Sequence, residues 1–132
     1  MSAAGKGSAV HWVCETCLNN GEDAVSMVGQ IYTTTDEPHS LLGSSGCSRW
    51  VACPGSISLT RQLPREVFNP ECYEITADMA DSAQVYLDYI RSLFCAEDVW
   101  TGNVLIWVEK RFDLEWLYPG MFGVGDCVVI SW

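Results

Sequence analysis

Residues 120–130 read GMFGVGDCVVI, a β-rich run whose single acid, Asp126, is flanked by apolar side chains. A second run of the same character, VLIWV, occupies residues 104–108. Strands that are apolar on both faces are typical of sheets that are covered on both sides. A Pro-Gly turn signal between the two runs predicts that they pair as an antiparallel hairpin. We therefore expect Asp126 to lie close to Glu109, which directly follows the first run.

Residues 76–93 predict an amphipathic helix. Thr76 is placed to cap its first turn, and Asp78 and Asp81 lie near the positive end of the helix dipole, with Arg91 near the other end. Apolar side chains recur at intervals of three and four residues, which is the helical period. This apolar stripe consists of Met79, Ala83, Tyr86, Ile90 and Leu93. We expect the stripe to form core by packing on a sheet.

The N-terminal part of the chain predicts a different element. Residues 1–8 read as a frayed tail of small residues, and β-rich runs at 9–14 and 24–33 flank a polar Asn-Asn-Gly turn signal. This pattern predicts a β-hairpin, so residues 1–37 are interpreted as an N-terminal extension. Residues 38–132 are expected to form a second part, whose family resemblance is given below, and the whole chain is expected to fold as one compact domain. Within them, Ser44 is expected to cap a short helix over residues 45–52 that stops before Pro54.

These elements predict an α/β fold in the looser α+β sense, with a small mixed sheet and flanking helices. A hydrophobic content of 48% excludes a disordered chain, and 132 residues suffice for a core. No run of about 18 apolar residues predicts a membrane span, and the N-terminus lacks the apolar segment of a signal peptide. These features predict a cytoplasmic protein, in which the seven cysteines are reduced, metal-bound or buried.

The charge balance bears on the partner. Seventeen acids against seven bases give a net charge of −10, which repels a phosphate backbone at long range. Direct binding of nucleic acid is therefore not expected. An acidic surface suits a basic protein, including one that itself binds nucleic acid. The alternative is that the acids only keep the protein soluble.

Four segments resemble, in the same order, a phage and prophage family of RecB-like exonucleases with the PD-(D/E)xK core. Residues 39–56 (HSLLGSSGCSRWVACPGS) are similar to the opening of that family, and residues 74–90 to a later helix. Residues 108–114 and 120–130 are similar to its first two core strands. The resemblance implies a trimmed nuclease-like core in which Glu109 and Asp126 occupy metal-binding acidic positions.

The chain also departs from that family. A histidine-bearing helix is expected between the Cys-Pro-Gly-Ser segment and the helix at 76–93, but neither His11 nor His39 lies there. The acid and lysine of the next strand are missing from the 132 residues. Lys110 follows Glu109 directly, so on a regular strand it points to the opposite face. The resemblance therefore predicts that Glu109 and Asp126 are vestigial and that no catalytic residue remains.

Four cysteines are candidate zinc ligands. Cys14 and Cys17 form one C-x₂-C half, Cys47 and Cys53 could complete four thiolates, and His11 or His39 could replace one of them. The alternative is that Cys14 and Cys17 are small packing residues. The family's later cysteines are missing, so no iron–sulfur cluster is expected. We expect no cofactor, with a structural zinc as the alternative.

Four of the six tryptophans are candidate partner-binding residues. Trp12, Trp100, Trp116 and Trp132 fall at the ends of predicted elements or between them, where exposed aromatic side chains anchor interfaces. The alternative is that they cover sheet edges and faces. Trp50 and Trp107 are expected in the core.

The sequence thus predicts a non-catalytic, phage-type inhibitor that resembles an anti-CRISPR protein. It would bind a basic component of a nucleic-acid-targeting defence system in the cytoplasm of the bacterial host. An uncovered edge of the Asp126 strand would also suit a target or a homodimer. The alternative is a residual or split metal-dependent DNA exonuclease completed by a partner chain. A third interpretation is a decayed prophage fragment without a function.

Overall fold

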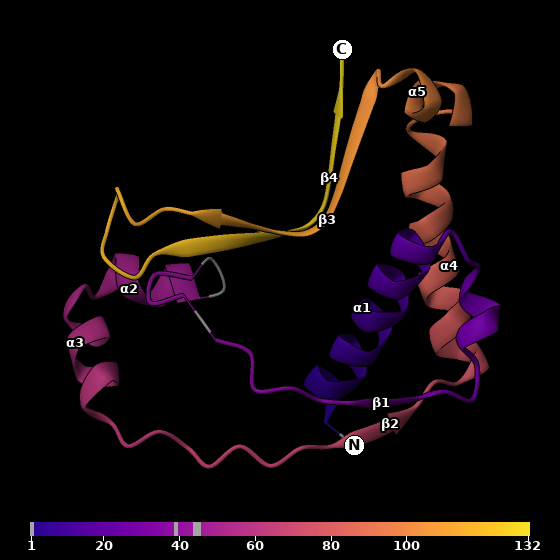
Figure 1. Cartoon of the computed structure of the whole chain (residues 1–132). Coiled ribbons are helices and arrows are strands. Elements are labelled where there is room, and N and C mark those ends of the chain that lie inside the picture. Colours follow the sequence, from indigo (N-terminus) through magenta and orange to yellow (C-terminus); the bar gives the residue numbers. More distant parts are fainter. Residues whose placement is uncertain (1, 39, 44–45) are drawn as a thin grey trace. The chain divides into compact units, whose positions relative to one another are not determined.

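The computed structural model describes residues 2–38, 40–43 and 46–132 (Figure 1). It confirms the expected α/β class in its looser α+β sense. The elements in chain order are α1 (Ala3–Asn20), the 3₁₀ helix η1 (Ala24–Met27), β1 (Ile31–Thr33), α2 (Cys47–Ala52), α3 (Gly55–Gln62), β2 (Cys72–Glu74), α4 (Ala77–Ser92), α5 (Ala96–Thr101), β3 (Val104–Asp113) and β4 (Phe122–Ser131). None of the described helices is both long enough and apolar enough to cross a membrane.

The predicted N-terminal hairpin is wrong, because residues 3–20 form α1. The side chain of Ser2 caps this helix by accepting a hydrogen bond from the backbone N–H of Gly5. The expected hairpin turn is instead the C-terminus of the helix, where Gly21 takes a left-handed φ of 69° and donates its N–H to the carbonyl of Cys17. The β-rich residues of 9–14 bury one helical face, whose four-residue period outweighs their individual strand preference.

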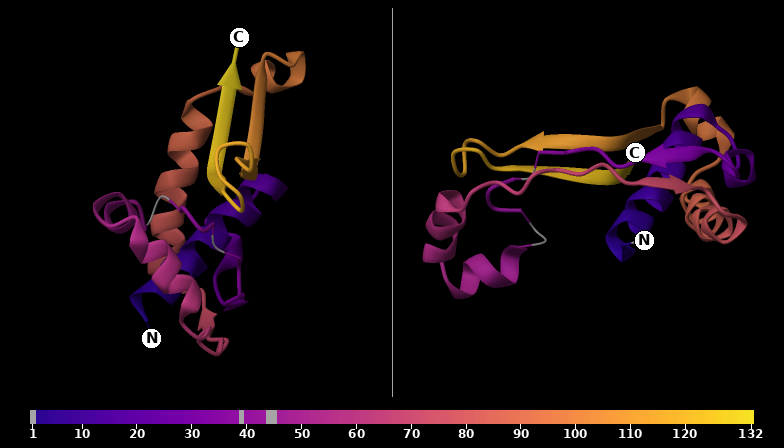
Figure 2. Two further views of the ribbon diagram at one scale, coloured as in Figure 1. Left: turned by 90° about the vertical axis from the view of Figure 1, so that its left-hand side faces the viewer. Right: turned by 90° about the horizontal axis from the view of Figure 1, so that it is seen from below.

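The strands form two separate ladders rather than one sheet. In the first, β1 and β2 are antiparallel, with Ile31 opposite Glu74 and Thr33 opposite Cys72. In the second, β3 pairs with β4, as the hairpin prediction required (Figure 2). Each ladder has two strands within the described residues, so residues 104–108, whose apolar faces suggested a strand inside a sheet covered on both sides, form one strand of a two-stranded ladder.

Contacts divide the chain into two compact units. The first comprises Met1–Thr35, Pro70–Glu109 and Asp126–Trp132, and the second comprises Asp36–Asn69 and Lys110–Gly125. The first unit therefore combines most of the expected N-terminal extension with later parts of the chain. It holds the buried core and the candidate site.

The core of the first unit lies between α1 and α4 (Figure 1). Small side chains such as Ala9 and Ala83 let the helices approach, while Val13 and Leu87 fill the space between them; all four are 0% exposed. Complete burial of each larger apolar side chain contributes about 1.5–3 kcal/mol. The first ladder is joined to η1 because Ile75 exchanges backbone hydrogen bonds with Gly29 and Gln30, each 2.9 Å long.

Helix α4 confirms its predicted cap, since the Thr76 hydroxyl accepts a hydrogen bond of 3.3 Å from the N–H of Met79. Its buried face is rotated from the predicted stripe and consists of Ala80, Ala83, Leu87 and Ile90. Met79 and Tyr86 pack at the margin of the core, and Leu93 is exposed. The expected packing on a sheet is wrong, because α4 contacts mainly α1 and η1.

The second unit contains α2, α3 and the distal part of the β3–β4 ladder. Helix α2 ends at Ala52, with Cys53 as its C-cap before Pro54, as predicted, while the predicted Ser44 cap lies outside the described residues. No residue of either helix is buried, and Trp50, expected in the core, is half-buried and donates to the carbonyl of Gly43. On the ladder, the Arg111 guanidinium lies 3.7 Å from the centre of the Phe122 ring.

Two glycines of α1 provide a matched test of its packing. A Cβ atom at Gly5 would lie 1.9 Å from the Tyr73 hydroxyl oxygen, whereas one at Gly7 meets nothing within 4 Å. We expect Gly5→Ala to lower the free energy of unfolding by about 1–3 kcal/mol because it overpacks the core. Gly7→Ala should raise it by about 0.5–1 kcal/mol because alanine favours the helix. Urea unfolding followed by circular dichroism measures both, and equal effects would contradict the packing of α1 on Tyr73.

Candidate metal site

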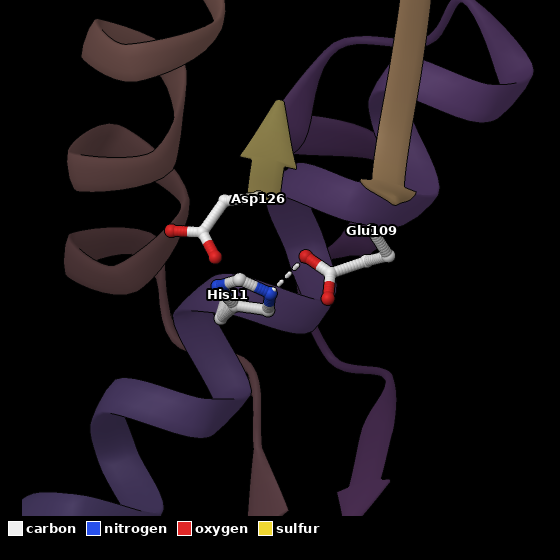
Figure 3. Close-up of side chains that lie close together, drawn as sticks. All are labelled: His11, Glu109 and Asp126. Atoms are coloured by element: carbon white, nitrogen blue, oxygen red, sulfur yellow. Dashed lines mark hydrogen bonds and ion pairs between the residues drawn. The ribbon is translucent and has the colours of Figure 1, made fainter. Parts of the chain in front are cut away.

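Three side chains converge in the first unit, each from a different element. His11 comes from α1, Glu109 from β3 and Asp126 from β4, and Figure 3 shows the two carboxylates on either side of the imidazole. One ligand atom from each residue lies within 4.8 Å of the other two. The closest pair is His11 Nε2 and Glu109 Oε1, at 2.5 Å. The expected proximity of Glu109 and Asp126 is confirmed, and a histidine is added to them.

Local backbone geometry positions each of the three groups. His11 lies on α1 between the buried residues Ala9 and Val13, at the margin of the core, and its side chain is 41% exposed. Glu109 has a φ of 53°, a left-handed conformation that is unusual for a residue with a side chain. Side chains of a regular strand alternate between its two faces, and by this rule Glu109 and Lys110 would point in opposite directions. The φ of Glu109 interrupts the rule at this point of β3. Such strain typically costs about 1–3 kcal/mol and is concentrated at functional sites.

The cluster opens into a cavity of about 310 Å³. Helix α1 contributes one face of the cavity, which includes Glu15, one turn beyond His11. Helix α4 contributes Ser82 and Tyr86. None of the lining residues is a lysine or an arginine, so the charged groups of the cavity are carboxylates. This environment attracts cations.

The donor set is suited to a divalent cation. Carboxylate oxygens are the ligands that Mg²⁺ and Mn²⁺ prefer, and an imidazole nitrogen shifts the preference toward transition metals. Exposure of Asp126 leaves room for water to complete the coordination. The sequence suggests His11 only as a replacement ligand in a zinc site, because nothing in residues 9–14 indicates that this side chain meets Glu109 and Asp126.

The predicted zinc ligands lie in different surroundings. Cys14 and Cys17 are buried on α1, whereas Cys47 and Cys53 are exposed and belong to the second unit. Burial, reinforced by the neighbouring Cys17 thiol, raises the pKa of Cys14 to about 11, and burial also raises the pKa of Cys17. Among the described residues of the first unit, the metal-ligating cluster contains no cysteine. The packing alternative accounts for the burial of Cys14 and Cys17.

The four candidate tryptophans differ in exposure. Trp100, Trp116 and Trp132 are 89%, 78% and 70% exposed. Trp12 is instead half-buried against the core, with its ring centre 5.5 Å from that of Tyr32. Trp107, expected in the core, is also half-buried.

The fold and the cluster together define a small α+β protein with a candidate divalent-cation site. A family model described as a protein of unknown function, DUF2800, matches residues 66–132. Because the match covers half of the chain, the chain belongs to this family. The matched segment includes Glu109 and Asp126 but not His11. No curated protein and no solved structure matched the chain.

The raised pKa of Cys14 predicts a loss of stability in alkali. The folded thiol stays protonated up to a pKa of about 11, whereas an unperturbed thiol ionises near the ordinary value of 9.0. The corresponding stabilisation is complete below pH 9 and is lost as the pH rises toward 11. Partial solvation limits the expected loss to about 1–2 kcal/mol.

Urea unfolding at a series of pH values, for the wild type and Cys14→Ala, measures this loss. The difference between the two proteins isolates Cys14 from other groups that titrate in alkali. Cys47→Ala is the matched control, because Cys47 is exposed, and its slope should equal that of the wild type. Parallel slopes for the wild type and Cys14→Ala would contradict the assignment of this thiol to the core.

Proposed function

We propose that this chain binds a divalent cation and takes part in metal-dependent hydrolysis of phosphodiester bonds. The observation that carries the proposal is the convergence of His11, Glu109 and Asp126 at the margin of one cavity. The sequence resemblance to RecB-like exonucleases supports metal binding by Glu109 and Asp126, and the hydrolytic step in this proposal adds His11 and Glu15 to the two acids that the resemblance alone leaves vestigial. The proposal therefore favours the nuclease alternative over a purely non-catalytic role.

The residues of the cluster have distinct roles in this proposal. Glu109 and Asp126 supply hard carboxylate oxygens, and His11 supplies an imidazole nitrogen beside them, since its Nε2 lies 2.5 Å from Glu109 Oε1. When bound, a divalent cation offsets the negative charge of a phosphate and makes a coordinated water more acidic. Glu15 lines the same cavity, where its carboxylate is available to accept a proton from the attacking water.

The first test is metal binding. We expect one Mn²⁺ to bind per chain, and Mg²⁺ to bind more weakly because magnesium has less preference for imidazole nitrogen. Asp126→Asn and His11→Ala should each weaken Mn²⁺ binding about tenfold or more, because each removes one of three ligands. Titration calorimetry and the electron paramagnetic resonance signal of free Mn²⁺ measure the affinity. Glu66→Gln is the matched control, since it removes one exposed charge from the second unit.

The same variants connect binding to activity. Linear double-stranded and single-stranded DNA should be cleaved with Mn²⁺ by the wild type and by Glu66→Gln but not by Asp126→Asn. Cleavage that persists in Asp126→Asn would come from another site or a contaminant. Affinities for Mn²⁺ that are equal in all four proteins would refute the proposed metal site.

The second candidate is the inhibitor of a nucleic-acid-targeting defence system, with a basic protein as its partner. The exposure of Trp100, Trp116 and Trp132 favours it, because such side chains anchor interfaces when a partner buries them. The net charge of −10 would speed the encounter with a positively charged surface. In this reading, tight Mn²⁺ binding would be dispensable.

A basic DNA-binding nuclease of a defence system provides the probe for this candidate. Its association rate with the chain should fall as salt is raised, because charge interactions are screened beyond about 10 Å at 0.1 M. Trp100→Ala should increase the rate at which the complex dissociates, because it removes an exposed aromatic anchor. A chain that inhibits the nuclease equally at low and high salt would exclude electrostatic steering.

A further inference from the structure

The cavity next to the metal cluster is negatively charged and would repel an anionic substrate. Its charged lining groups, Glu15, Glu109 and Asp126, are all carboxylates, and it has no lysine or arginine. One bound divalent cation offsets only part of this negative charge. A phosphate ester would therefore need a neutral hydrogen-bond donor in the cavity to hold its remaining oxygens.

Four lining side chains carry donors, and three of them are already engaged. The Cys14 thiol donates to the carbonyl of Ala83 at 4.0 Å. His11 Nε2 interacts with Glu109 at 2.5 Å. The Ser82 hydroxyl donates to the carbonyl of Asp78 at 2.9 Å. The hydroxyl of Tyr86 forms no hydrogen bond with any residue that the structure describes, and because it is not among the fully buried polar atoms it is accessible to a ligand that enters the cavity.

The position of Tyr86 suits such a role. It lies on α4 between the fully buried residues Ala83 and Leu87, and its half-buried ring packs at the margin of the core. The hydroxyl lies beside the acidic cluster, and because a tyrosine phenol is protonated at neutral pH it is a hydrogen-bond donor there.

We propose that Tyr86 is a substrate-binding residue whose hydroxyl donates a hydrogen bond to a non-bridging oxygen of a phosphate ester held at His11, Glu109 and Asp126. This inference rests on the proposed metal-dependent function and adds the residue that recognises the anion. The rigid attachment of the ring to the core places the donor in advance, so little ordering is needed when the substrate binds.

The test compares Tyr86→Phe with Tyr89→Phe. Both changes remove one hydroxyl from α4, but Tyr89 is 62% exposed and does not line the cavity. The probe is thymidine 5′-monophosphate, titrated into each Mn²⁺-loaded protein, with inorganic phosphate as a second probe. We expect Tyr86→Phe to bind both probes about tenfold more weakly, because a hydrogen bond to a charged group is lost. Tyr89→Phe should match the wild type.

Mn²⁺ affinity, measured separately, distinguishes the two proposals. Both variants should bind Mn²⁺ as the wild type does, since neither hydroxyl is a proposed ligand, and both should keep the wild-type circular dichroism spectrum. Failure of the wild type to bind Mn²⁺ would refute the proposed function. Normal Mn²⁺ binding with equal phosphate affinity in the wild type and Tyr86→Phe would refute the role of Tyr86 alone.

If cleavage is measured, Tyr86→Phe should raise KM more than it lowers kcat, because the lost bond is present before the reaction. The inference would also be overturned if Tyr86→Phe bound thymidine 5′-monophosphate more weakly but bound inorganic phosphate as the wild type does. The hydroxyl would then contact the nucleoside rather than the phosphate.

Discussion

The packing of α1 against α4 is the interaction on which the first unit depends. Ala9 and Ala83 permit the close approach, and Val13 and Leu87 occupy the space that remains, all without exposure to solvent. Protein interiors are packed as densely as organic crystals, so the relative position of two such helices is defined closely. His11 and Tyr86 lie at the margin of this contact, and the contact therefore fixes one wall of the candidate site.

The β3–β4 pair supplies the other wall of the candidate site, and the backbone is strained there at Glu109. Glu109 occupies a left-handed conformation within a strand, where a glycine would be more easily accommodated. The conformation coincides with the carboxylate that contacts His11 at 2.5 Å. Since total protein stability is only about 5–15 kcal/mol, strain at one residue is tolerated only where surrounding contacts hold it. The coincidence of strain, clustered ligands and a cavity supports a functional interpretation of this position.

The acidic composition of the chain affects long-range encounter and local binding in different ways. The net charge of −10 disfavours long-range attraction of nucleic acid and favours a basic partner. Three of the chain's acids, Glu15, Glu109 and Asp126, line a cavity that has no lysine or arginine among its described residues, and this creates a site for a cation. A cation bound there would offset part of the local negative charge and offer a positive centre to a phosphate, so an acidic chain and an anionic substrate are compatible at short range. Net charge governs long-range encounter, whereas the composition of a cavity governs what binds in it.

The sequence by itself determined the elements whose signals are local. Thr76 capped α4 as expected because an N-cap needs only the residues of the next turn, and Pro54 ended α2 because proline restricts the residue before it. The pairing of β3 with β4 followed from two apolar runs joined by a short turn, and with it the proximity of Glu109 and Asp126.

Only the tertiary structure decided the rest. The β-forming residues of 9–14 became helical because their four-residue period buries one face against α4, and strand preference is weaker than this burial. His11 therefore joined Glu109, 98 residues away, and no local pattern could have indicated this pairing. Likewise, Cys14 and Cys17 have the spacing of metal ligands, yet their burial in the helix interface makes them part of the core. Spacing along the chain identifies candidate ligands, but the packing of distant elements decides which of them meet.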